Sequence, residues 1–395
     1  MLLAGVSIRF PVFCECVFVL SEKQKKAFLF CRLHHMMYLC RHKYIIMKKL
    51  TLFFILSFSL VAVCGFAEKK YSVYAVGFYN QENLFDTCHD DGKNDYEFLP
   101  GGSYRWNGLK YTHKLRNMAR VLADMGTDVL PQVGCAVIGV SEVENSKVLD
   151  DLTAQQPLRA RGYKYVHVEG PDKRGIDCAL LYNPSLFKVG TVKLVPYVPD
   201  ASMRPDYATR GFLTVTGEMG GDQVAFIVCH WPSRAAGSAY RERAASLVKD
   251  VKDSLLRINP DMKVMVMGDM NDDPTNKSMK DILRALPDVD EVGEGDMYNP
   301  WYNLLAKQGQ GTLSYQGSWN LFDQIVMTPN MLDKGGKKDY STLKFFRNKI
   351  FRRDYIINKE GRYKGIPKRT HAGGAWLDGY SDHLPVVVYL VKEQQ

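Results

Sequence analysis

Residues 262–274 read "MKVMVMGDMNDDP", an apolar run that ends abruptly in a crowd of polar side chains. The run up to Gly268 predicts a buried strand, and three carboxylates and one amide fall within the next five positions. Asn, Asp and Pro favour turns, so the polar part can be interpreted as a simple turn. It can equally be a rigid strand end that presents polar groups to a substrate or a metal. The segment alone leaves both interpretations open.

The same arrangement, an apolar strand with polar residues at one end, recurs along the chain from residue 71 onward. The polar residues at these ends are Asn80 and Glu82, Glu142 and Glu144, His230, Asp269 and Asn271, Asp323, and Asp382 with His383. Many short strands with few helices between them predict an α/β fold of two packed sheets flanked by helices, in one domain over residues 68–395. In such a sandwich we expect these strand ends to converge on one rim.

The residue types at the strand ends exclude several enzyme classes and favour one. Acids and amides without cysteine ligands suit a hard cation, Mg²⁺ first, with Mn²⁺ or Ca²⁺ as alternatives. Six histidines follow residue 67, and none pair at HxxxH or HExxH spacing, which argues against a zinc hydrolase. A P-loop and a Gly-x-Ser-x-Gly elbow are both absent from the sequence. A metal-assisted hydrolysis is what remains, with His or Asp moving protons.

Residues 1–67 differ from the rest of the chain in charge and pattern. They carry nine Lys or Arg and two acids, whereas the remainder carries 43 basic and 41 acidic residues. The basic excess of the whole chain therefore says little about what the folded domain binds. Four cysteines follow residue 67, too few for a disulfide scaffold. Cys135, Cys178 and Cys229 lie in strand-like runs and are predicted to be buried thiols; with Cys88 they leave room for one disulfide.

Residues 47–67, "MKKLTLFFILSFSLVAVCGFA", have a basic start, an apolar stretch and small residues near the end. This layout predicts a secretory signal peptide cleaved after Ala67, and hence a secreted or periplasmic protein. A membrane anchor is the alternative, because a bilayer takes roughly 20 apolar residues; lipid modification of Cys64 is another. Residues 1–46 show no regular period, so we expect irregular structure there and interpret them as a gene-model extension, with translation starting at Met47. Membrane contact is expected only through an uncleaved signal or a lipidated Cys64, and no obligate protein partner is evident.

Seven short motifs follow one another in order: "FYNQENLFD" (78–86), "GVSEVEN" (139–145), "RGIDCALLYNP" (174–184), "CHWPSR" (229–234), "MGDMNDDP" (267–274), "FDQIVM" (322–327) and "YSDHLPVVV" (380–388). Together they resemble the endonuclease/exonuclease/phosphatase superfamily, the deoxyribonuclease I-like enzymes, over essentially all of residues 71–391. The resemblance implies a four-layered α/β sandwich, two packed mixed sheets flanked by helices, with the active site at one rim. It also implies a secreted bacterial phosphoesterase.

The resemblance assigns a role to each motif residue. Glu142 is the principal metal ligand, with Asn80 and Asp382 beside it. Asp269 and Asn271 orient or activate the attacking water and hold the phosphate, and His230 stabilises the phosphate or protonates the leaving oxygen. His383 acts on the phosphate or as the base, oriented by Asp323; whether Asp269 or His383 takes the proton from water stays open.

Three further residues are candidates for binding substrate. Arg174 and Arg234 stand next to motif residues and suit bidentate contact with a phosphate, although surface ion pairs would explain them nearly as well. Asp177 would orient His230, but the family position is shifted by one residue here. Glu82 and Asp86 can alternatively be helix caps, and Asp272 and Asp273 turn residues.

The sequence does not rank the possible phosphate esters. The leading hypothesis is a secreted Mg²⁺-dependent phosphodiesterase, a nuclease acting on DNA or RNA. Residues 344–369 interleave basic and aromatic residues, a pattern that suits phosphate contact and base stacking or, equally, a solvated hairpin. The alternatives are a phosphatase or phospholipase-type enzyme on inositol phosphates, sugar phosphates or lipid head groups, and a catalytically inactive binding protein on the same fold.

Overall fold

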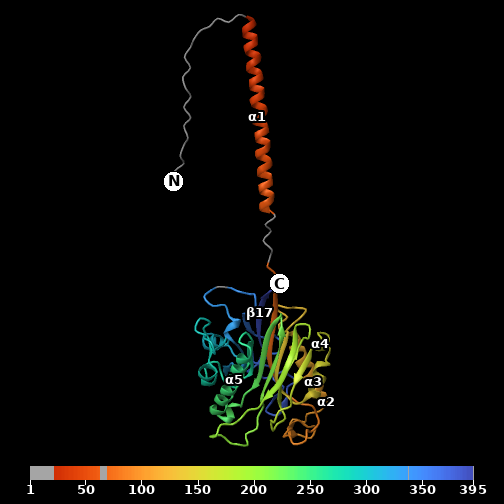
Figure 1. Ribbon diagram of the computed structural model, residues 1–395. Coiled ribbons are helices and arrows are strands. Elements are labelled where there is room, and N and C mark those ends of the chain that lie inside the picture. Colours follow the sequence, from red (N-terminus) through yellow and green to blue (C-terminus); the bar gives the residue numbers. More distant parts are fainter. Residues whose placement is uncertain (1–21, 63–68, 337, 395) are drawn as a thin grey trace. The chain divides into compact units, whose positions relative to one another are not determined.

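The computed structural model describes residues 22–62, 69–336 and 338–394 (Figure 1). The chain divides into two units, Met1–Glu68 and Lys69–Gln395. In the first, α1 (Glu22–Ala62) is one continuous helix. Residues 22–46, for which the sequence suggests irregular structure, are therefore helical instead. The start at Met47 stays a prediction, and both Cys64 and the cleavage point after Ala67 lie outside the described residues.

Within residues 22–62, 69–336 and 338–394, no helix combines the length and the apolarity that a bilayer crossing requires.

The second unit contains two sheets. The first has six strands in the order β14-β17-β1-β2-β4-β3. Their bounds are Lys344–Ile350, Val386–Glu393, Tyr71–Leu84, Val137–Val143, Asp177–Tyr182 and Lys164–His167. β1 pairs with β2 in parallel, whereas the other neighbours in this sheet are antiparallel. The central strands are apolar almost without interruption, as expected for strands covered on both faces.

The second sheet has seven strands in the order β5-β6-β7-β8-β13-β10-β9. Their bounds are Phe187–Val195, Phe212–Met219, Asp222–His230, Lys263–Asp269, Asp323–Met327, Met297–Tyr298 and Ala285–Leu286. β7 and β8 are parallel, and the buried run that opens the sequence analysis forms β8. Two small hairpins lie outside the sheets: β11 (Leu313–Tyr315) with β12 (Ser318–Asn320), and β15 (His371–Ala372) with β16 (Ala375–Trp376).

Apolar side chains fill three layers of core. The middle layer joins the facing sides of the two sheets through residues such as Phe78, Val137, Phe226 and Met267. Helices cover the outer faces: α2 (Gly108–Asp124), α3 (Ser146–Thr153) and α4 (Gln156–Arg159) on the first sheet, and α5 (Ser238–Ile258) with the π-helical turn Ser278–Ile282 on the second. The remaining short helices are Tyr96–Phe98, Arg234–Ala236, Tyr302–Ala306 and Pro329–Met331. The predicted four-layered α/β sandwich is confirmed.

Local sequence signals account for the outer helix α2. The Asn107 side chain caps its first turn by accepting from the backbone N–H of Lys110. Its buried residues, Tyr111, Leu115, Met118 and Leu122, recur at helical spacing and form one apolar face. This face packs on the first sheet.

Candidate active site

Two parallel strand pairs bring the polar strand ends to one rim of the sandwich. Because β1 runs parallel to β2, and β7 to β8, the carboxyl ends of each pair lie together. His230 and Asp269 are register partners at the ends of β7 and β8. Glu142 directly follows Ser141, the register partner of Asn80.

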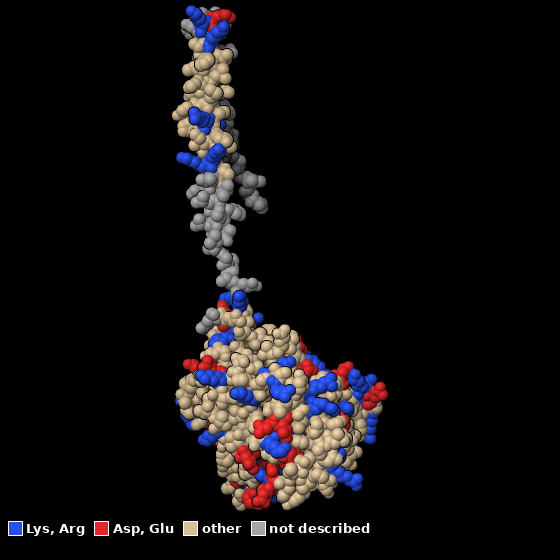
Figure 2. Space-filling view, turned by 90° about the vertical axis from the view of Figure 1, so that its right-hand side faces the viewer, with Lys and Arg blue, Asp and Glu red and all other residues tan. Residues whose placement is uncertain are grey.

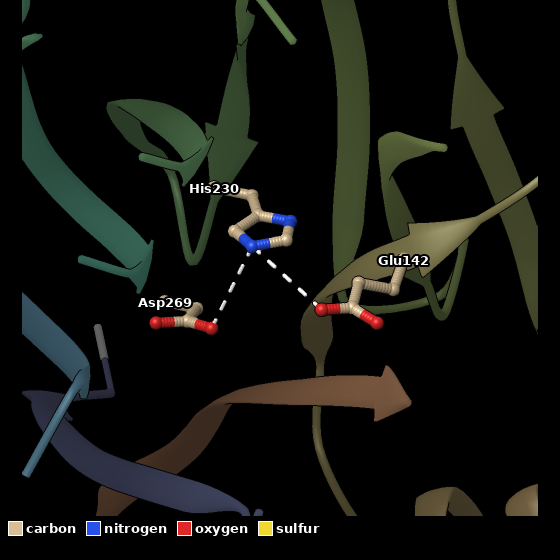
Figure 3. Close-up of side chains that lie close together, drawn as sticks. All are labelled: Glu142, His230 and Asp269. Atoms are coloured by element: carbon tan, nitrogen blue, oxygen red, sulfur yellow. Dashed lines mark ion pairs between the residues drawn. The ribbon is translucent and has the colours of Figure 1, made fainter. Parts of the chain in front are cut away.

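Glu142, His230 and Asp269 point toward one another at this rim (Figure 3). His230 Nε2 lies 3.7 Å from Glu142 Oε1 and 3.7 Å from Asp269 Oδ2. Asn80 Nδ2 donates to the same two carboxylates, at 3.1 Å to Glu142 and 3.0 Å to Asp269. One ligand atom from each of the three labelled residues lies within 4.8 Å of the other two, which suits a single cation.

The backbone around this cluster is strained. Glu82, Asn83, Glu142 and Asn271 all have positive φ, from 46° to 60°, although none is glycine. The β1–β2 register shifts between Asn80 and Leu84, so both strands bulge where their polar residues stand. The backbone N–H of Asn83 donates to Glu142 Oε2 at 2.9 Å. Strain of this kind is retained where the surrounding structure enforces it, commonly at functional sites.

The donor set fits a divalent cation. Burial raises the pKa of Asp269 to about 6, helped by the carboxylates of Asp323 and Glu142 and opposed by His383 and the N–H of Asn271. A bound cation stabilises the ionised form of carboxylates that lie this close together. Asn80 and Asp382, the other expected ligands, make different contacts. Asn80 Oδ1 accepts from the Glu82 N–H, and Asp382 Oδ2 accepts from Arg369 at 2.8 Å.

The two site histidines are held in opposite protonation states. Burial lowers the pKa of His230 well below its ordinary value, and Arg210, Arg174 and His383 add to the effect. Burial also acts to lower the pKa of His383, but the carboxylates of Asp323, Asp269 and Asp382 outweigh it and raise that pKa well above its ordinary value. These shifts favour the neutral form of His230 and the imidazolium form of His383.

The structure forms the expected His383–Asp323 pair. His383 Nδ1 and the fully buried Asp323 Oδ2 are 2.7 Å apart. His383 Nε2 faces the site, 3.8 Å from Asp269 Oδ2 and 3.9 Å from Asp382 Oδ1. Ser381 fixes this segment, since its hydroxyl donates to Asn80 O and accepts from the His383 N–H.

Of the polar residues after β8, one contacts a site residue and the others stabilise the turn. Asn271 donates its backbone N–H to Asp269 Oδ1 and its side-chain amide to Trp231 O. Asp272 is buried and pairs with Arg241 at 2.7 Å, so it is more than a turn residue. Asp273 accepts from the Leu321 N–H.

Arg234 forms the surface ion pair that was the alternative to phosphate contact, whereas Asp177 has a partner other than the one expected. Arg234 braces the turn after β8, through Asn271 O at 3.2 Å and Asp273 Oδ2 at 2.9 Å. The expected pairing of Asp177 with His230 is wrong. Asp177 faces the edge strand β3 and accepts from His167, at 3.0 Å, and from the Gly170 N–H. Among the described residues, His230 Nδ1 has no hydrogen-bond partner.

Arg174 lies close to the site, as predicted, and its guanidinium donates to Asn83 Oδ1. Sequence reasoning missed three other charged residues. Arg210 is buried beside His230 and bonds Asp172 and Trp231 O. Arg369 contacts Glu82 and Asp382, and Lys114 supports that segment from α2. Only Arg369 carried a signal, because it ends the basic segment before the "YSDHLP" motif.

Several solved structures are similar to this chain. An endonuclease/exonuclease/phosphatase family protein from Bacteroides thetaiotaomicron is 18% identical, with a TM-score of 0.50, and the match covers 82% of this chain and 100% of that one. A mannosyl-6-phosphatase from the same species is 18% identical, with a TM-score of 0.49, and the match covers 80% and 99%. D. rerio TDP2 complexed with a single-strand DNA product is 14% identical, with a TM-score of 0.47, covering 81% and 99%. A search of curated proteins gives no match.

The sequence model of the Endonuclease/Exonuclease/phosphatase family matches residues 75–392, which include every strand of both sheets apart from the first residues of β1 and the last residue of β17. The chain belongs to this family.

Proposed function

We propose that this phosphoesterase-family chain is a divalent-metal-dependent hydrolase of phosphodiester bonds, acting as a nuclease. One observation carries the proposal: the Glu142–His230–Asp269 cluster and the His383–Asp323 pair meet at the same rim. The arrangement places two carboxylates, a neutral imidazole and an imidazolium around one point. Family membership supplies the reaction class.

The pKa shifts support the following assignment of the proton transfers. Asp269 is ionised above about pH 6, and as the general base it takes the proton of the attacking water. Its Oδ1 is oriented by the Asn271 N–H. His383, charged and held by Asp323, donates to the phosphate oxygen as negative charge develops there. Neutral His230 donates a hydrogen bond from Nε2 on the opposite side.

Glu142 is the residue around which a cation would be held, with the carboxylate of Asp269 beside it. Asn80 and Asp382 stay predicted ligands. The bound Mg²⁺, or Mn²⁺ or Ca²⁺, would neutralise the phosphate charge.

Residues 344–369 support the nuclease assignment in part. Arg352 lies 5.7 Å from the Trp319 ring, and Arg362 lies 5.8 Å from the ring of exposed Tyr363. Lys349 and Arg353 are instead ion-paired with acids near the end of α2. Charges of both signs are spread over the face of the catalytic unit in Figure 2, so attraction to a polyanion has to come from local groups.

The test is a substrate panel with and without EDTA: plasmid DNA, RNA, bis-p-nitrophenyl phosphate, and phosphomonoesters of inositol and sugars. We expect EDTA-sensitive cleavage of nucleic acid and of the diester. A preference for monoesters would replace the nuclease assignment by that of a phosphatase. If no ester were turned over, the assignment as a binding protein would remain.

Site variants test the residue roles. Glu142→Ala and His383→Ala should each lower kcat/KM by on the order of 100-fold or more while the melting temperature is retained. Glu218→Ala, which removes an exposed carboxylate on β6, is the matched control and should keep the wild-type rate. Full activity in both site variants would refute the assignment.

We also propose that the protein is exported through the signal in residues 47–67. The N-terminal sequence of the secreted protein tests this. A mature chain that begins at Glu68 is the expected result, and retention of α1 would contradict it.

A further inference from the structure

The end of β1 holds two arginines that come from distant parts of the chain. Asn83 Oδ1 accepts from Arg174, which lies in the loop before β4. Glu82 Oε1 accepts from Arg369 Nε at 3.4 Å, and Arg369 lies just before β15. Adjacent residues of one bulged strand end thus direct two guanidinium groups.

Both arginines border the proposed catalytic cluster. The Asn83 residue that holds Arg174 also donates its N–H to Glu142 Oε2 at 2.9 Å. Arg369 Nη2 lies 2.8 Å from Asp382 Oδ2, and Asp382 Oδ1 is 3.9 Å from His383 Nε2. The Arg369 side chain is 47% exposed, so solvent reaches the guanidinium.

Tyr104 packs beside the segment that carries Arg369. Its ring lies against Phe98 and His371, with centroids 5.1 and 4.6 Å apart. Burial and Glu97 raise the pKa of Tyr104, whereas Arg174 and Arg369 act to lower it. Among the described residues, no side chain or backbone group is hydrogen-bonded to its hydroxyl.

Both guanidinium groups have N–H donors that these contacts do not use. A guanidinium has five N–H donors. The contacts to Glu82 and Asp382 use Nε and Nη2 of Arg369 and leave Nη1 uncommitted. The side-chain contact of Arg174 to Asn83 uses Nη2 alone. Uncommitted, partly exposed N–H forks beside a phosphate-ester site match the geometry of phosphate oxygens.

We infer that Arg174, Arg369 and Tyr104 form a subsite for a second phosphate of the substrate, adjacent to the phosphate that is hydrolysed. The inference rests on the proposed function and narrows it. The substrate class becomes phosphate esters with a neighbouring phosphate, whether along a nucleic-acid backbone or on a sugar or inositol ring.

Two matched substrate pairs test the subsite on the full chain. One is a thymidine dinucleotide with and without a 5′-phosphate, and the other is fructose 1,6-bisphosphate against fructose 6-phosphate. We expect the wild type to prefer the doubly phosphorylated member of at least one pair by roughly 10-fold or more in kcat/KM. The pair that shows the preference identifies nucleotide or sugar as the source of the second phosphate.

Arg369→Gln should lower kcat/KM for the preferred member by roughly 10- to 100-fold more than for the singly phosphorylated member. Tyr104→Phe keeps the ring and should cause a smaller loss of the same preference. Arg284→Gln is the matched control, because Arg284 is an exposed arginine paired with a carboxylate, Asp296, at 2.9 Å. It should keep the wild-type preference.

A binding measurement makes the test independent of turnover. Calorimetry in the presence of Mg²⁺ measures the binding of methylene bisphosphonate and of methylphosphonate to both proteins. The wild type should bind methylene bisphosphonate at least tenfold more tightly than Arg369→Gln does. Equal loss of activity on both members of each pair, with a raised Mg²⁺ requirement, would overturn the subsite and give Arg369 a role through Asp382. Phosphoesterase activity without any preference for a second phosphate would refute the subsite alone; absence of phosphoesterase activity would refute the proposed function as well.

Discussion

Asn83 contacts two different residues of the proposed site, Glu142 and Arg174. Its backbone N–H holds the carboxylate of Glu142, and its side chain holds Arg174. Its φ of 56° is tolerated by Asn better than by most residues, and by Gly without strain. The two functions of Asn83, backbone and side chain, can therefore be separated by substitution.

Asn83→Gly should retain the backbone contact and the melting temperature but lower kcat/KM by about 3- to 10-fold, because Arg174 loses its acceptor. Asn83→Ala should also reduce the free energy of unfolding, by about 1–2 kcal/mol, because alanine resists the left-handed conformation. Kinetics and thermal unfolding of both variants measure this. Unchanged kinetics in Asn83→Gly would show that Arg174 is held without Asn83.

His371 gives a pH-dependent contribution to stability. Burial lowers its pKa to about 4, with Lys110, Lys114 and Arg369 adding to the effect. Since the unfolded chain binds the proton near pH 6.5, and the folded chain only near pH 4, stability should fall as pH decreases through this window. His371→Phe should reduce the acid-induced drop in melting temperature by on the order of 1–3 °C. An identical pH profile for the variant would contradict this account.

At the scale of elements, strand direction creates the site. β1–β2 in the first sheet and β7–β8 in the second are the long parallel pairs among the described strands. Each pair delivers two polar ends to the same rim. The antiparallel strands contribute from their starts, with Asp323 opening β13 opposite Asp269, and His383 standing before β17.

Helix α2 anchors the segment that carries Arg369 and Asp382. Lys114 of α2 is 2% exposed, and its ammonium group bonds Thr370 Oγ1 at 2.6 Å and Tyr380 O at 2.5 Å. Burial lowers the pKa of Lys114 to about 8, and Glu82, Asp382 and Glu142 counteract the shift. The positive charge of Lys114 thus acts on the three acids Glu82, Asp382 and Glu142 of the rim.

Lys114→Met should lower the free energy of unfolding by about 1–3 kcal/mol, because two acceptors lose their donor. It should also lower kcat/KM, because Arg369 and Asp382 shift. Lys252→Met is the control: Lys252 is equally buried, but it lies on α5 and bonds Gly295 O. This control should destabilise the protein without changing kcat/KM at a permissive temperature. Equal kinetic effects in both variants would show that only global stability matters.

The predictable part of the structure is the part that hydrophobic patterning controls. The strand runs, α2, α5 and the polar strand ends follow from local composition, and with them Glu142, His230, Asp269, Asp323 and His383 as a converging set. Side-chain direction at a bulge does not follow from local composition. Asp177 stands at such a bulge beside motif residues in the sequence, yet its side chain faces β3. Arg369 lies in a segment without periodicity, where only tertiary contacts determine position.

At the scale of the whole molecule, the catalytic unit begins at Lys69 and is compact by itself. Its first strand is fixed along its length by β17, from Tyr71 opposite Glu393 to Phe78 opposite Val386. The N-terminal unit supplies none of the residues of the proposed site.

A chain that begins at Lys69 should therefore fold with the melting temperature of the full chain, within about 2 °C, and with the same kcat/KM. Calorimetry and kinetics of the two forms make the comparison. Loss of activity in the shorter chain would show that residues 1–68 contribute to the site.

The pairing of β1 with β17 also has a consequence during biosynthesis. The first strand of the unit pairs with its last strand, and Asp382 and His383 follow the other proposed site residues in the sequence. A nascent chain that ends before β17 therefore has an incomplete central sheet and an incomplete site, since such long-range pairings form late. We expect hydrolytic activity to appear only after β17 has left the ribosome and paired with β1.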